Sequence, residues 1–99
     1  MNMQQMLMQA QKMQRELQKA QDELKKKEFT VSKGGAVTVV VLGDKTIKSI
    51  DVDKDAFDPD NKEMVEEMIA MAVNEAHKQI DVEVAQINEA ITGRSGGLF

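Results

Sequence analysis

The chain of 99 residues has no cysteine, tryptophan or tyrosine, and it contains one proline and one histidine. Without cysteine it can form neither a disulfide nor a thiolate metal site. Without Trp and Tyr, the bases of a single-stranded nucleic acid have almost no aromatic platform on which to stack. Three phenylalanines leave a core made mainly of Val, Ile, Met and Ala. A small aliphatic core of this kind favours stabilisation by oligomerisation.

Long apolar runs are also missing. No run approaches the ~18 residues that span a membrane, and the N-terminus has polar glutamines where a signal peptide has its apolar segment. The sequence therefore predicts a cytoplasmic protein without membrane contact.

The net charge of −4 is distributed unevenly along the chain. Residues 1–33 carry seven Lys and Arg against four acids, residues 34–60 carry three against six, and residues 61–99 carry three against seven. We therefore expect an acidic partner to meet the first third of the chain and to be repelled by the rest.

The first third is predicted to be one long helix, from about Asn2 to Lys27, because Gly and Pro are absent and apolar residues recur in steps of three and four. These residues are Met3, Met6, Ala10, Met13, Leu17, Ala20 and Leu24. The coiled-coil-like pattern predicts a seam that packs against another helix. Its candidate dimer or packing residues are Met6, Met13, Leu17 and Leu24.

The opposite face of this helix carries a stripe of cations at spacings of three, four and seven residues: Lys12, Arg15, Lys19 and Lys26. Phosphate binding needs long cationic side chains on one accessible face, and this spacing provides them. The alternative interpretation is a solvated face that keeps the helix soluble, with Glu16, Asp22 and Glu23 diluting the charge.

Residues 28–52 are predicted to form a three-stranded antiparallel meander. The strands are expected at 28–33, 36–42 and 46–52. Gly34-Gly35 suits a tight hairpin, and the β-branched middle strand is typical of a strand covered on both faces. In the third strand, Ile47 and Ile50 point to opposite faces unless a bulge intervenes.

A second helix is predicted to follow the sheet. Its N-cap is expected at Asp60, with Glu63 in the capping-box position, and Asp58 capping a helix that begins with Pro59 is the competing boundary. Gly93 is expected to end the helix in a left-handed conformation.

Residues 1–92 are thus predicted to form a single α+β domain of helix, three strands and helix, followed by a flexible tail at 93–99. At about 1.5 Å per residue both helices are longer than the sheet. Their overhanging apolar faces need a partner, so we expect a two-fold homodimer with projecting helices.

Patterns typical of metal binding are incomplete. Asp51, Asp53 and Asp55 have the spacing that opens a calcium loop. Such a loop needs Gly at its sixth position and Glu at its twelfth, where this chain has Ala56 and Lys62. A strand end and an acidic helix entry explain these aspartates better.

Catalytic patterns are equally weak. His77 has Glu75 and Asp81 nearby on the second helix but no nucleophile or substrate pocket, which favours a surface or interface histidine over a general base. Gly34-Gly35 lacks the Lys-Ser/Thr continuation of a phosphate loop. The N-terminal methionines have the spacing of a packing seam rather than a soft-metal site. The sequence predicts no enzyme, metal, cofactor or small-molecule substrate.

Six segments together resemble the YbaB/EbfC family of bacterial nucleoid-associated proteins. They are residues 2–6, 9–14, 34–39, 50–52, 72–76 and 92–93. The resemblance implies a helix–three strands–helix fold, an intertwined tweezer-like homodimer, DNA binding without a cofactor, and a role in nucleoid organisation or gene regulation in the cytoplasm. It also implies DNA contacts from the long helices, which matches Lys12, Arg15 and Lys19.

Two hypotheses follow. The first is a dimeric nucleoid-associated protein that binds duplex DNA through phosphate contacts, with weak sequence specificity because no helix-turn-helix or zinc finger is present. The alternative is a protein-interaction scaffold that docks a client helix on its Met-rich N-terminal arm.

Overall fold

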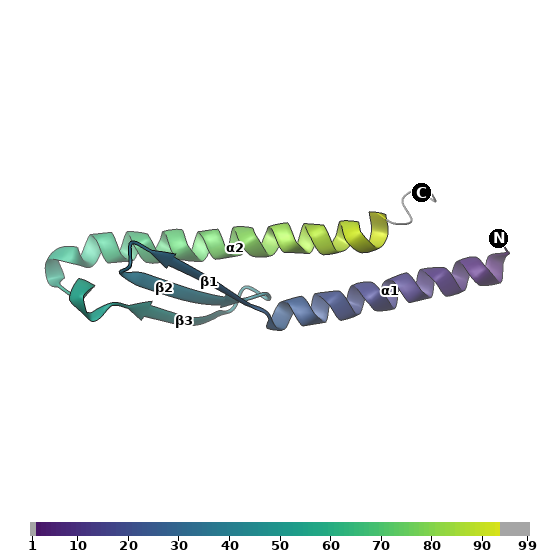
Figure 1. Ribbon diagram of the computed structural model, residues 1–99, viewed down its shortest axis with the longest axis horizontal. Coiled ribbons are helices and arrows are strands. Elements are labelled where there is room, and N and C mark those ends of the chain that lie inside the picture. Colours follow the sequence, from purple (N-terminus) through teal and green to yellow (C-terminus); the bar gives the residue numbers. More distant parts are fainter. Residues whose placement is uncertain (1, 94–99) are drawn as a thin grey trace.

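A computed structural model describes residues 2–93, in which one long helix lies along a small sheet and a second, antiparallel to it, extends away from the end of the sheet (Figure 1). The elements are α1 (Met3–Lys26), β1 (Glu28–Lys33), β2 (Val37–Leu42), β3 (Ile47–Val52) and α2 (Lys62–Thr92). Two short 3-10 turns, Lys54–Ala56 and Pro59–Asn61, connect β3 to α2. The predicted helix–meander–helix fold is confirmed. The tail predicted at 93–99 lies, from residue 94 onward, outside the described residues.

Helix α1 begins with a capping box. The Asn2 side chain accepts a hydrogen bond from the Gln5 backbone N–H at 2.7 Å, and the Gln5 side chain accepts one from the Asn2 N–H at 3.4 Å. The pair satisfies two of the donors that every helix N-terminus leaves free. At the other end, Lys27 adopts extended backbone angles and leads directly into β1.

The three strands form one antiparallel sheet in the order β1-β2-β3. Gly34 and Gly35 have φ values of 59° and 65°, as the predicted tight hairpin requires. Between β2 and β3 the register shifts by one residue, so that Lys48 has no partner in the ladder. This bulge places Ile47 and Ile50 on the same face of the sheet, opposite Val41 and Val39 of β2.

Strand β2 is fully buried on one face only. Val37, Val39 and Val41 are completely buried beneath α2, whereas the alternate residues of β2 remain half-buried on the other face. The prediction that β2 is covered on both faces was wrong. Helix α1 does not fold back over the sheet but continues away from it, so no element within residues 2–93 covers the second face (Figure 1).

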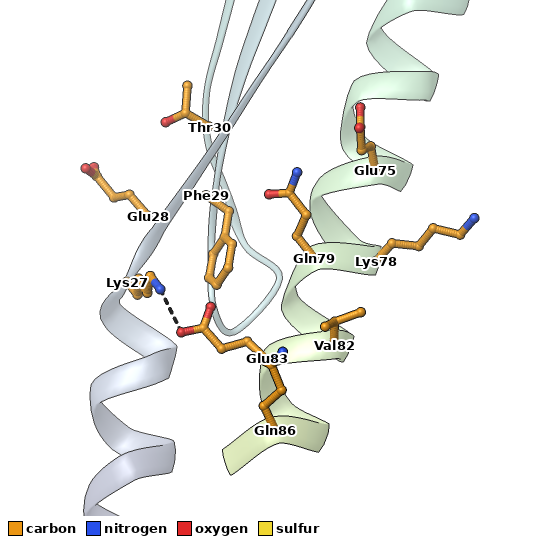
Figure 2. A pocket seen from close by; sticks show the side chains of 10 residues that line it. All are labelled: Lys27, Glu28, Phe29, Thr30, Glu75, Lys78, Gln79, Val82, Glu83 and Gln86. Atoms are coloured by element: carbon orange, nitrogen blue, oxygen red, sulfur yellow. Dashed lines mark hydrogen bonds and ion pairs between the residues drawn. The ribbon is translucent and has the colours of Figure 1, made fainter. Parts of the chain in front are cut away.

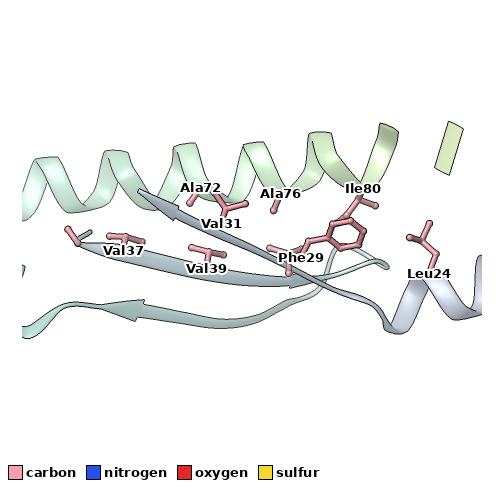
Figure 3. Packing of buried hydrophobic residues seen from close by; sticks show 10 residues of the cluster. Leu24, Phe29, Val31, Val37, Val39, Ala72, Ala76 and Ile80 are labelled. Atoms are coloured by element: carbon pink, nitrogen blue, oxygen red, sulfur yellow. The ribbon is translucent and has the colours of Figure 1, made fainter. Parts of the chain in front are cut away.

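The first half of α2 packs on β1 and β2 through Ala72, Ala76 and Ile80, which are all buried (Figure 3). The two alanines allow the helix backbone to approach the sheet closely, and Ile80 fills the space beside Phe29. Truncating a buried Ile side chain typically costs about 2–5 kcal/mol. This layer is the centre of the core.

The second half of α2 packs on α1. Val84 and Ile87 are half-buried, Ile91 is buried, and Leu24 of α1 is buried against the core cluster. The molecule measures 69 × 20 × 14 Å and has a radius of gyration of 19.6 Å, against about 13 Å for a compact chain of this length. Both helices therefore extend beyond the sheet, and the part of the α1 seam from Met13 to Leu24 is partly or fully covered within the chain.

The predicted start of α2 and the predicted form of its C-terminal cap need correction, whereas the helix ends at Thr92 as expected. Asp58 caps the turn Pro59–Asn61 by accepting a hydrogen bond from the Asp60 N–H at 2.9 Å, and α2 itself begins after Asn61, whose side chain makes no cap. The Asp60–Glu63 capping box is therefore absent. The competing prediction, with Asp58 as the cap and Pro59 as the first residue, matches the 3-10 turn that precedes α2. Gly93 has a φ of −65°, so the expected left-handed cap was also wrong.

The turn between β2 and β3 touches the end of α1. Gly43 is buried there, and its N–H donates to the Lys27 carbonyl at 2.9 Å. A Cβ atom at this position would lie 1.7 Å from the Leu24 carbonyl oxygen. Hydrogen bonds from Thr46 hold the same turn together and lower the pKa of the Asp44 carboxyl. The absence of a side chain at Gly43 thus allows α1 to leave the sheet where it does.

We expect Gly43→Ala to reduce the free energy of unfolding by about 3 kcal/mol, because the new methyl group must displace helix backbone rather than a flexible side chain. Urea unfolding followed by circular dichroism measures this loss. The control is Gly35→Ala, where no atom lies within 4 Å and only the positive φ is strained, at a cost of about 1 kcal/mol. Equal losses would contradict the steric requirement at Gly43.

Candidate nucleic-acid interface

Helix α1 exposes all four residues of the predicted cationic stripe. Lys12, Arg15, Lys19 and Lys26 are solvent-exposed, and helical spacing places them on the side of α1 opposite Leu17 and Leu24. Leu24 is buried and Leu17 half-buried on the side that packs within the chain. The stripe therefore lies on the outer side of the projecting helix.

The cations outside α1 are mostly neutralised, and those of α1 are not. Five lysines from the sheet, its turns and the start of α2 form ion pairs: Lys27, Lys33, Lys45, Lys48 and Lys62. Within residues 2–93, none of the four stripe residues forms an ion pair. The difference leaves the charge of the stripe available to an external anion.

Three of these pairs hold α2 against the sheet. Lys27 lies 2.6 Å from Glu83, Lys33 lies 2.5 Å from Glu75, and Lys45 lies 2.9 Å from Asp81. Such partly exposed pairs contribute little to stability individually. Their electrostatic effect is that three lysines next to or within the sheet are neutralised by acids of α2.

The two helices differ strongly in charge. Helix α1 carries five Lys and Arg against three acids, whereas α2 carries two lysines against seven acids. A polyanion is therefore attracted along α1 and repelled along α2.

Acidic residues do interrupt the stripe. A shallow depression on α1 is lined by Arg15, Gln18, Lys19, Asp22, Glu23 and Lys26. Asp22 accepts a hydrogen bond from Gln18 at 3.0 Å, which keeps its carboxylate engaged on the helix surface. Lys25, also exposed and without an ion pair within residues 2–93, adds a fifth cation to this end of α1.

The predicted seam residues fall into different environments. Leu24 is buried in the core, Leu17 and Met13 are half-buried, and Met6 is 55% exposed. The seam is thus covered at its C-terminal end and open at its N-terminal end.

A second concave surface, of about 590 Å³, lies between β1 and α2 (Figure 2). Phe29 forms its floor, and the Lys27–Glu83 ion pair closes one end. Lys78 and Glu75 give its rim mixed charge. Within residues 2–93, no three His, Asp or Glu side chains gather in a way that could hold a metal ion. This groove lacks the single sign of charge that a phosphate site needs.

The structure also places two other candidates from the sequence, Asp53 and His77. Asp53 caps the turn Lys54–Ala56 by accepting a hydrogen bond from the Asp55 N–H at 2.8 Å. His77 is half-buried on α2, and its Nε2 atom is enclosed without a hydrogen-bond partner among the described residues. Neither arrangement forms a catalytic centre.

Taken together, these features define the class of protein: a small α+β domain in which an antiparallel meander carries two long helices, one of them cationic and projecting. Within residues 2–93, no helix is long and apolar enough to cross a membrane. The chain belongs to the YbaB/EbfC DNA-binding family, whose family model matches residues 1–95.

Relatives match along almost the whole chain. A nucleoid-associated protein of Clostridium botulinum is 49% identical over 100 residues, covering 99% of this chain and 88% of the relative. One from Clostridium novyi is 47% identical, covering 94% of this chain and 82% of the relative. One from Acetivibrio thermocellus is 45% identical, covering 98% and 87%. These comparisons confirm the family resemblance drawn from the sequence.

We expect the triple variant Lys12→Gln, Arg15→Gln, Lys19→Gln to change the free energy of unfolding by less than about 0.5 kcal/mol, because exposed side chains without ion pairs contribute little to folding. Urea unfolding measures it. The matched control removes the same charge from the sheet lysines that hold α2: Lys27→Gln, Lys33→Gln, Lys45→Gln. That control should lose about 1 kcal/mol, since its three ion pairs are partly exposed. A larger loss in the stripe variant would show that the stripe is structural.

Proposed function

We propose that this protein binds duplex DNA through the cationic stripe of α1, by contacts to phosphates. One observation carries the proposal: the stripe cations are exposed on a projecting helix without ion pairs inside residues 2–93, while the lysines of the sheet are paired with acids. The membership of a DNA-binding family supports duplex DNA as the anion.

The length of the stripe fits several successive phosphates. Lys12 and Lys26 are fourteen residues apart, which corresponds to about 21 Å along the helix axis. Phosphates of one DNA strand are spaced about 3.4 Å apart along the duplex, so the stripe can follow roughly six of them. Glu16, Asp22 and Glu23 lower the number of favourable contacts. We expect about three phosphates to be neutralised by each chain.

Sequence specificity should be weak. Phosphate contacts position a protein on the duplex without reading bases, and α1 places its cations rather than a cluster of base-reading side chains on the exposed face. The shape and deformability of the DNA remain as sources of preference. This behaviour suits nucleoid organisation or broad gene regulation. The relatives described above carry the name nucleoid-associated protein, which supports a nucleoid location for this chain.

We further propose that the protein acts as a homodimer that uses β3. Ile47 and Ile50 are 44% and 45% exposed and lie on the sheet face that α2 covers over β1 and β2. Helix α2 hardly reaches β3, so this edge of the apolar face stays open. A second copy covering the edge would complete the core and present two cationic helices to one duplex.

DNA binding should weaken steeply with salt. A dimer that neutralises roughly six phosphates gives a slope of log affinity on log salt near −5. The triple stripe variant Lys12→Gln, Arg15→Gln, Lys19→Gln should bind at least about tenfold more weakly in moderate salt, with a shallower slope. Fluorescence anisotropy with a labelled duplex, across a salt series, measures both quantities.

The matched control removes three charges from outside α1: Lys54→Gln, Lys62→Gln, Lys78→Gln. This control should bind DNA nearly as well as the parent, because these lysines lie beside the acidic helix or in the loop before it. Equal losses in the two variants would show that only net charge matters. A strong preference for one DNA sequence would contradict the phosphate mechanism.

For the dimer, sedimentation equilibrium should give the mass of two chains at micromolar concentration. The variant Ile47→Thr, Ile50→Thr keeps β-branched side chains but removes apolar surface, and it should raise the dissociation constant at least about tenfold. Val40→Thr, on the opposite face of the sheet, is the control and should leave the dimer intact. A monomeric parent, or equal effects of both variants, would overturn the dimer interface on β3.

A further inference from the structure

The first ten described residues, Asn2 and the start of α1, form a surface that no other residue within 2–93 covers. This α1 tip, residues 2–11, extends beyond the C-terminal end of α2 (Figure 1). Every residue in it is exposed, including Met3 at 87%, Met6 at 55% and Leu7 at 60%. An exposed group of large apolar side chains at the end of a projecting helix indicates an interaction site.

The tip is a formed helix and not a frayed end. The capping box between Asn2 and Gln5 satisfies its first backbone donors and needs no other contact to do so. The apolar side chains are thereby held in fixed positions along one side of α1, in line with the part of the seam that packs on α2. The tip therefore extends the apolar side of α1 beyond the point where α2 ends.

The pattern of apolar residues in the tip is self-complementary. Met3, Met6, Leu7 and Ala10 share one side of the helix, and their spacing reads the same in both directions. A second tip placed antiparallel would put each Met3 opposite the small Ala10 of the other copy at the ends of the overlap, and Met6 opposite Leu7 at its centre. Antiparallel pairing buries all four residues of each copy.

The charges of the tip also fit a second copy. Residues 2–11 contain no Lys, Arg, Asp or Glu, and their polar positions are mainly glutamine. Two such tips can approach without like-charge repulsion, and the first cation, Lys12, lies beyond the overlap. A partner of high charge, including DNA, finds no opposite charge here.

We propose that the α1 tip is a self-association surface that joins two copies of this chain in an antiparallel pair of helices. The overlap of ten residues is about 15 Å long, so a single tip pair is weak and depends on several molecules being held together. The cationic stripe lies on the other side of α1 and stays open. Where the proposed DNA binding also holds, paired tips would link two DNA-bound molecules and so bridge separate duplexes.

Because the chain has no cysteine, a single introduced cysteine reports on tip pairing. We would introduce Met6→Cys at the centre of the proposed overlap and treat the protein with a short bis-maleimide. The matched control is Met8→Cys, in the same tip and 65% exposed before substitution, but on the side of the stripe. Met6→Cys should form cross-linked chains at least about tenfold faster, because pairing raises the local concentration of the two thiols.

The mass of the cross-linked product identifies the contact. Sedimentation of the untreated protein first defines its unit, whether that is one chain or two. Cross-linking through position 6 should then at least double the mass of this unit, and adding Met3→Gln and Leu7→Gln should reduce the rate to that of the control.

An unchanged mass would place the contact inside the dimer and overturn the proposal. A rate no faster than that of Met8→Cys would also overturn it, as expected for a tip that docks a different protein. Neither result depends on DNA binding, which the salt series tests separately.

Discussion

The packing of α2 on two different partners is the constraint on which the rest of this structure depends. One apolar side of a 31-residue helix meets the sheet through Ala72, Ala76 and Ile80, and then meets α1 through Val84, Ile87 and Ile91. Since the sheet is only six residues long in each strand, it can cover only part of such a helix. The remainder of α2 supports α1 and holds it away from the sheet, which makes the molecule long and leaves the outer side of α1 open.

Charge is segregated by the same arrangement. The lysines of the sheet and its turns face the acids of α2 and pair with Glu75, Asp81 and Glu83, so the middle of the molecule has little free positive charge. Helix α1 meets α2 through its apolar seam, and its stripe cations point away from those acids. A protein with a net charge of −4 can thus present one cationic surface to DNA. In the proposed mechanism, DNA binding and folding therefore use opposite sides of one helix.

Elements with a regular sequence pattern were predicted well, whereas the helix cap and the tertiary contact at Gly43 were not. The two helices and the glycine hairpin at Gly34-Gly35 follow from local spacing, because helices and tight turns impose their periods directly on the sequence, and the spacing of Ile47 and Ile50 left open the bulge that β3 has. The start of α2 was mistaken because several aspartates compete as caps and only the folded chain selects Asp58. The steric role of Gly43 was invisible, since Leu24 comes near it only after the turn folds against α1.

By itself the sequence determined the fold class, the family and the residues of the stripe, because these depend on order and spacing along one chain. Tertiary structure decided which of these residues are buried or paired within the chain. It buried Leu24 but left Met6 exposed, because α2 ends before it can cover the whole seam. It also paired Lys27, Lys33 and Lys45 with acids 56, 42 and 36 residues away, while leaving the cations of α1 without such partners inside residues 2–93. Spacing along the chain cannot reveal which distant charge will lie within 4 Å, since only the packing of α2 on the sheet brings these groups together.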